Sequence, residues 1–144
     1  MKTILRVVAV ALAFVALTAD ARDDRLHFSV KESMARSETK DKLDGSVKFY
    51  WGKNVPGGAR TMGTFTANKK TNFFNKSDAE GCYWAWLSAM VSLQQRAIKE
   101  GGNAVVNIHS VYRDKEFTSA TEYECGAGNV TGGVALRGTV AKLK

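Results

Sequence analysis

Four residues are the best candidates for nucleophilic or metal chemistry in this chain: Cys82, Cys125, His27 and His109. A thiolate near a helix start can act as a nucleophile, and cysteines combined with a histidine can bind a metal ion. However, no C-x-x-C or H-x-x-x-H spacing occurs, and Cys82 lies a full turn inside a predicted helix, on its apolar side. The residues therefore favour a disulfide between Cys82 and Cys125. A metal-handling site built from Cys82, Cys125 and His109 is the alternative.

Three other patterns could indicate chemistry. Glu122 and Glu124 lie two apart in a strand-like segment, so their carboxylates share one face and could serve a hydrolase, although a solvated sheet face is the more common reason. The stretch GAGNVTGG (126–133) lacks the spacing and the following helix of a dinucleotide-binding loop, and GVALRGTV (133–140) has Thr139 where a P-loop needs lysine. We therefore assign no catalytic residue and no cofactor, and an ATPase has no support.

These residues must be positioned by a long helix, which the sequence predicts from Ser77 to about Glu100. Ser77 suits the N-cap, Glu80 completes a capping box, and Gly101 and Gly102 suit the left-handed end. The helix is amphipathic. Its apolar stripe consists of Cys82, Trp86, Ala89, Met90, Leu93 and Ala97, and the opposite side carries Ser88, Ser92, Gln95, Arg96 and Lys99.

Strands surround this helix in the sequence. Alternating apolar and polar residues predict strands at 45–52, 103–112, 119–127 and 132–143, and residues 61–67 could return as another. In the predicted strand 103–112, we expect Val106 and Ile108 on one face. Residues 68–76 (NKKTNFFNK) are expected to form a polar loop. The predicted class is α+β: an antiparallel or mixed sheet of four to five strands, with one long amphipathic helix on one face.

The N-terminus predicts export. Lys2 and Arg6 precede an apolar run at 7–17, and Ala19-Asp20-Ala21 resembles a signal-peptidase site. The predicted organisation is a signal peptide (1–21), a polar segment (22–44) that is either an edge strand or a loosely held arm, and a single domain (45–144). After cleavage near Ala21, 19 basic and 13 acidic residues would remain, with no further segment apolar enough to span a membrane.

The segments SDAEGCYWAWLSAMVSLQQRAIKEGGNAVVNIHSVY (77–112) and TEYECGAGNVTGGVALRGTV (121–140) resemble a family of small exported bacterial proteins of unknown function. The resemblance covers about residues 45–143. Some members carry an excinuclease ATPase subunit label, which the missing P-loop of this chain contradicts. More distantly, the helix and the N-A-V-V segment look like the YbjQ-type domain and the outer-membrane stress-sensor lipoprotein of the Rcs pathway. This chain departs from that lipoprotein, because it has no lipidation cysteine and at most one disulfide.

The function that we predict is a non-enzymatic, disulfide-stapled binding or protein-interaction module in the periplasm. Its partner would be a periplasmic protein or an anionic envelope component, with no specific nucleic acid and no membrane span. The possible interaction surface contains Phe73, Phe74 and Trp84. A basic stretch near Lys48, Lys53 and Arg60 is a further candidate surface.

Overall fold

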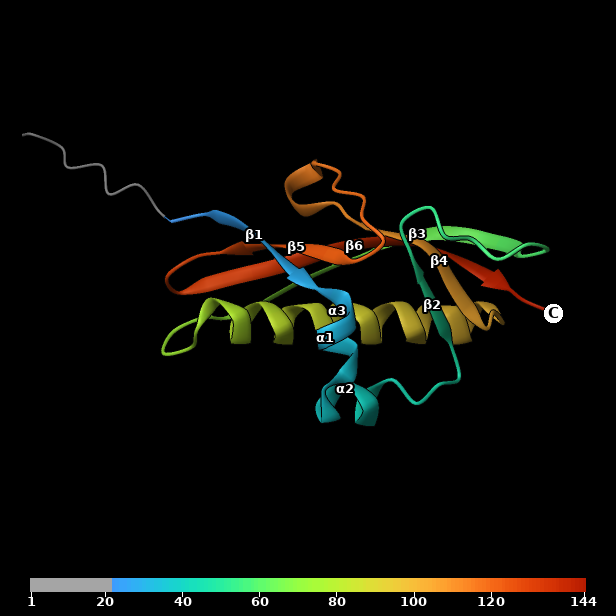
Figure 1. Ribbon diagram of the computed structural model, residues 1–144, viewed down its shortest axis with the longest axis horizontal. Coiled ribbons are helices and arrows are strands. Elements are labelled where there is room, and N and C mark those ends of the chain that lie inside the picture. Colours follow the sequence, from blue (N-terminus) through green and yellow to red (C-terminus); the bar gives the residue numbers. More distant parts are fainter. Residues whose placement is uncertain (1–21) are drawn as a thin grey trace, which may run out of the picture.

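The computed structural model describes residues 22–144 (Figure 1). The predicted signal peptide, residues 1–21, lies outside the described residues. In residues 22–144, no helix combines the length and the apolar character needed to cross a membrane. The elements are β1 (Asp24–Ser29), α1 (Val30–Ala35), α2 (Ser37–Lys42), β2 (Lys48–Trp51), β3 (Arg60–Asn72), α3 (Asp78–Glu100), β4 (Ala104–Ser110), the 3₁₀ turn η1 (Tyr112–Asp114), β5 (Glu122–Ala127) and β6 (Thr131–Lys142).

One open sheet of six strands is organised around β6, and the predicted α+β class is confirmed. β3 runs antiparallel to β6 along nearly its whole length. On the other side of β6, β5 pairs with the beginning of β6, and β4 pairs with the second half of β6. β1 adds antiparallel to β5, whereas β2 adds parallel to β4. The sheet is therefore mixed, with one more strand than the four to five that the sequence predicts.

α3 packs on one face of this sheet, and α1 and α2 lie on the same side (Figure 1). The predicted bounds of α3 are confirmed. The Ser77 hydroxyl accepts a hydrogen bond from the Glu80 amide at 3.2 Å, and Gly101 ends the helix in the left-handed region at φ 82°. Burial of the predicted apolar stripe against the sheet forms most of the core. The helix is thus held by its caps and by its apolar face.

The N-terminal segment is an edge strand followed by two short helices, rather than a loosely held arm. β1 pairs with β5 through six residues, from Asp24 opposite Ala127 to Ser29 opposite Glu122. Val30 and Leu43 belong to the same buried core as α3. Residues 24–44 therefore share the sheet and the core of the rest of the chain.

A bulge in β4 changes which residues face α3. Asn107 has a φ of +51°, and the pairing of β4 with β6 shifts between Val106 and His109. Because the extra residue reverses the alternation, Val105 and Ile108 both join the core beneath α3, whereas Val106 belongs to a separate small cluster. The expectation that Val106 and Ile108 share one face is therefore wrong.

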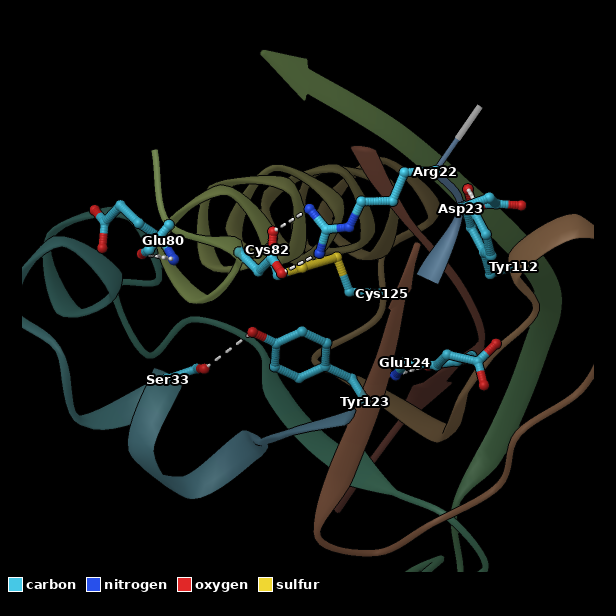
Figure 2. The surroundings of a disulfide bond; sticks show 12 residues. Arg22, Asp23, Ser33, Glu80, Cys82, Tyr112, Tyr123, Glu124 and Cys125 are labelled. Carbon is cyan, nitrogen blue, oxygen red and sulfur yellow. Dashed lines mark hydrogen bonds and ion pairs between the residues drawn. A yellow bond between two sulfur atoms is a disulfide. The ribbon is translucent and has the colours of Figure 1, made fainter. Parts of the chain in front are cut away.

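The predicted disulfide is confirmed. Cys82 and Cys125 are bonded, with their Cα atoms 5.8 Å apart (Figure 2). The bond joins the first turns of α3 to the middle of β5, and both cysteines are fully buried. Tyr123 and Cys125, two residues apart in β5, both belong to the core that α3 covers. The disulfide therefore ties the helix to the sheet from inside the core.

Candidate functional site

The alternative metal site is not assembled. Both thiols of that donor set are used in the disulfide, so they offer no thiolate. His109 directs Nδ1 to the Asn107 carbonyl oxygen at 2.8 Å, and its Nε2 lies 3.9 Å from Glu116. Among residues 22–144, no group of three or more His, Cys, Asp or Glu side chains is arranged to hold a metal ion.

The two carboxylates of the hydrolase hypothesis lie in different environments. Glu122 is exposed, whereas Glu124 is only 6 % exposed. The Glu124 carboxylate accepts from Arg25 at 2.6 Å and lies 3.0 Å from His27 Nε2. His27 is itself stacked on Phe117, with the ring centroids 4.0 Å apart. Glu124 thus contacts Arg25 and His27, two side chains of β1, and fastens β1 to β5.

The aromatic residues of the predicted interaction surface lie in three different settings. Phe73 is 3 % exposed and belongs to the core, so it contributes nothing to an exposed surface. Phe74 is 63 % exposed and points away from the core. Trp84 is half-buried, packed against the core at the edge of α3. Of the three, Phe74 and Trp84 are accessible to a partner.

The other predicted surfaces are rearranged by the fold. Residues 68–72 extend β3 to Asn72 and are not part of a loop, which is confined to residues 73–77. Lys48 and Arg60 begin β2 and β3, and β4 and β6 separate these strands in the sheet. The basic stretch is therefore divided between the edge strands β2 and β3.

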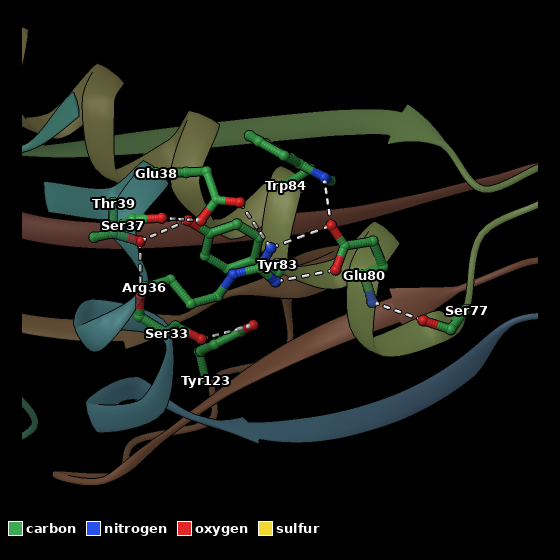
Figure 3. Close-up of polar contacts among 10 residues, drawn as sticks. All are labelled: Ser33, Arg36, Ser37, Glu38, Thr39, Ser77, Glu80, Tyr83, Trp84 and Tyr123. Atoms are coloured by element: carbon green, nitrogen blue, oxygen red, sulfur yellow. Dashed lines mark hydrogen bonds and ion pairs between the residues drawn. The ribbon is translucent and has the colours of Figure 1, made fainter. Parts of the chain in front are cut away.

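Trp84 is held in place by a polar cluster at the start of α3 (Figure 3). Its indole Nε1 donates to Glu80 at 2.9 Å, and Arg36 donates to the same carboxylate at 3.0 and 3.3 Å. The hydrogen bond from Arg36 lowers the pKa of Glu80, and Glu80 in turn raises the pKa of Arg36. The capping box is thus half formed, because the Glu80 side chain binds Arg36 and Trp84 instead of the cap residue Ser77.

Trp84 borders a groove between α3 and β3. Two adjoining hollows of about 290 and 400 Å³ form it, and they share Ser92 and Gln95. We call it the α3–β3 groove. Its lining consists of Phe65, Thr66, Ala67 and Lys69 from β3, Lys42 from α2, and Trp84, Leu87, Ser88, Val91, Ser92, Leu93, Gln95, Arg96 and Lys99 from α3.

The charge of this groove is uniformly positive. Four of the lining residues are cations and none is a carboxylate. Arg96 is engaged, because it pairs with Glu100 at 3.0 Å and lies over the Phe65 ring at 3.9 Å. Within residues 22–144, Lys42, Lys69 and Lys99 take part in no ion pair. Three lysine charges are therefore available to a ligand in the groove.

Part of this groove has a signal in the sequence. Ser88, Ser92, Gln95, Arg96 and Lys99 are the residues expected opposite the apolar stripe, and they form the α3 wall. The β3 wall comes from residues 61–67, expected as a possible strand, and from Lys69, expected in a loop. Nothing in the sequence indicated that these residues and Lys42 lie beside the helix, because only the fold brings the three segments together.

Comparisons of the chain with protein-family models, with curated proteins and with solved structures give no match. The family resemblance of the sequence stays a prediction.

Proposed function

We propose that this protein is an exported, non-enzymatic binding module whose α3–β3 groove holds an acidic partner in the periplasm. The observation that carries the proposal is the groove lining, which has four cations and no carboxylate. Lysines that lack an anionic neighbour attract a complementary charge and guide its approach. The half-buried Trp84 adds an apolar surface with a polar edge, a combination that is common in binding sites.

Other features support a binding role over catalysis. The cysteines are used in a buried bond, and the carboxylate of Glu124 is engaged by Arg25 and His27. A stable disulfide is also typical of proteins that fold in an oxidising compartment such as the periplasm. The proposal therefore assigns the cysteines and Glu124 to structure, and recognition to the groove.

Poly-L-glutamate, added to the purified oxidised protein at low salt, tests the proposal. We expect shifts of backbone amide resonances to cluster on α3 and β3, and binding to weaken as salt screens the charges. The variant Lys42→Gln/Lys69→Gln/Lys99→Gln should bind at least about tenfold more weakly, because three exposed charge contacts together are worth about that factor.

The matched control is Lys31→Gln/Lys53→Gln/Lys115→Gln, which removes three charges from exposed positions outside the groove. It should keep most of the affinity of the parent protein. An equal loss in both variants would mean that only net charge matters, and would count against the groove. Absence of any binding to poly-L-glutamate would refute the proposed function.

A further inference from the structure

β3 forms an open edge of the sheet next to the groove. Within residues 22–144, β3 pairs with β6 alone, through eleven residue pairs from Arg60 to Asn72. In an antiparallel strand, every second residue directs its N–H and C=O groups to the same side. One side of this 13-residue strand therefore presents a row of backbone donors and acceptors without a neighbouring strand.

The edge strand β3 borders the α3–β3 groove. Thr66 shows this, because it lines the groove although its side chain lies on the other face of the sheet, where its Oγ1 accepts from Arg137 Nε at 3.2 Å. The part of Thr66 that reaches the groove is its main chain. A chain segment placed beside β3 would thus meet backbone on one side and α3 beneath it.

The α3 wall is suited to receive alternate side chains of such a segment. The residues that α3 exposes to the groove are three or four positions apart. The small Ser88 and Ser92 leave room between the larger Trp84, Val91 and Lys99. From Trp84 to Lys99 the helix rises by about 22 Å. An extended chain covers that length in about seven residues, at about 3.3 Å each.

Charge decides which segment fits. Lys69 of β3 lines the same hollow as Lys42, and Lys99 lines the adjoining hollow. Inward-pointing lysines and β-bulges keep edge strands from pairing with each other. β3 has both features, since it carries Lys69 and its register shifts between Thr61 and Thr64. Two copies of β3 would bring the same positive charges together. An acidic strand would neutralise them.

We propose that an extended acidic segment of a partner protein adds to the free edge of β3 as a further strand, with every second side chain entering the α3–β3 groove. This mode of recognition combines main-chain hydrogen bonds, which give affinity, with side-chain pockets, which give selectivity. It depends on the proposed function, since it names the partner of the same groove.

A peptide of alternating glutamate and valine, about eight residues long with blocked ends, tests this mode. Two further versions carry N-methyl groups, one on every valine and the other on every glutamate. In a strand beside β3, only one of these two sets of N–H groups faces β3. We expect one methylated peptide to bind the oxidised protein at least about tenfold more weakly, and the other to bind as the parent peptide does. Hydrogen exchange of β3 amides should slow when the parent peptide binds.

The outcomes separate this proposal from the proposed function. If poly-L-glutamate binds in the groove but the alternating peptide does not, strand addition is wrong and acid recognition stands. The same conclusion follows if both methylated peptides bind as well as the parent. Binding of phosphatidylglycerol vesicles through the groove lysines, without slower exchange in β3, would identify a membrane surface as the partner and overturn strand addition. Failure of every acidic probe would refute both proposals.

Discussion

Tyr123 illustrates how a polar group is accommodated in this core. Its ring is 1 % exposed and stacks on Trp86, with the centroids 5.5 Å apart. Its hydroxyl accepts a long hydrogen bond from the Ser33 hydroxyl at 3.4 Å, which fastens α1 to β5 (Figure 2). Because burial penalises the charged phenolate, the pKa of Tyr123 is raised from 10.0 to about 12. The core therefore holds this residue in its neutral form.

A Tyr123→Phe variant should be less stable than the parent protein at neutral pH and about equally stable at alkaline pH. At pH 7 it loses the hydroxyl contact, and we expect it to be destabilised by about 1 kcal/mol. The pKa of Tyr123 is higher in the folded state than in the unfolded state. The stabilisation that the neutral side chain provides is therefore fully present below pH 10 and is lost as the pH rises toward 12. The parent protein should therefore lose about 1 kcal/mol relative to the variant by pH 11. Urea unfolding at pH 7, 10 and 11 measures this, and a pH-independent difference would contradict it.

At the scale of elements, the connection from β3 to α3 depends on two glycines that make room for Phe73. A Cβ atom on Gly81 of α3 would lie 2.7 Å from the Phe73 ring, and one on Gly132 of β6 would lie 2.5 Å from it. Phe73 also donates its backbone N–H to the Val130 carbonyl oxygen at 2.7 Å. This ring thus packs closely against both α3 and β6 at the point where the chain passes from β3 to α3.

A Gly81→Ala variant tests that arrangement. Alanine is the better helix former by about 1 kcal/mol, so an unobstructed position would gain stability. Here the added methyl group meets a rigid, buried ring, and overpacking of this kind costs about 1–3 kcal/mol. We expect a net loss of about 1 kcal/mol in chemical unfolding. Ser88→Ala on the exposed side of α3 is the control and should change stability little. A Gly81→Ala protein more stable than its parent would contradict the packing.

The elements also differ in how far the sequence predicts them. α3 was predictable from end to end, because Ser77 and Gly101 act locally and the apolar stripe repeats at the helical period. β3 was predicted only in part, since its exposed outward face and its lysines resemble a loop. β4 was predicted as a strand with the wrong faces, because the bulge at Asn107 depends on its neighbours in the sheet.

At the scale of the molecule, distant segments determine the candidate site. The α3–β3 groove brings together α2, β3 and α3, whose lining residues extend from Lys42 to Lys99. Pairing of β3 with the last strand of the chain positions one wall, and no local pattern indicates that pairing. The sequence therefore indicated Trp84 and the polar side of the helix as accessible, but not the groove that contains them.

The disulfide is the covalent link between the helical layer and the sheet, so its contribution should be global. It closes a loop with a sequence separation of 43, and the chain-entropy relation gives about 4 kcal/mol for a loop of that length. We expect Cys82→Ala/Cys125→Ala to lower the free energy of unfolding by about that amount, measured by urea denaturation. Reductant should lower the stability of the parent protein to a similar extent and leave the variant unchanged.

The disulfide acts mainly by restricting the unfolded chain. The folded variant should therefore still bind poly-L-glutamate with the affinity of the parent. A stability change below about 1 kcal/mol would mean that packing of α3 alone holds the two layers together.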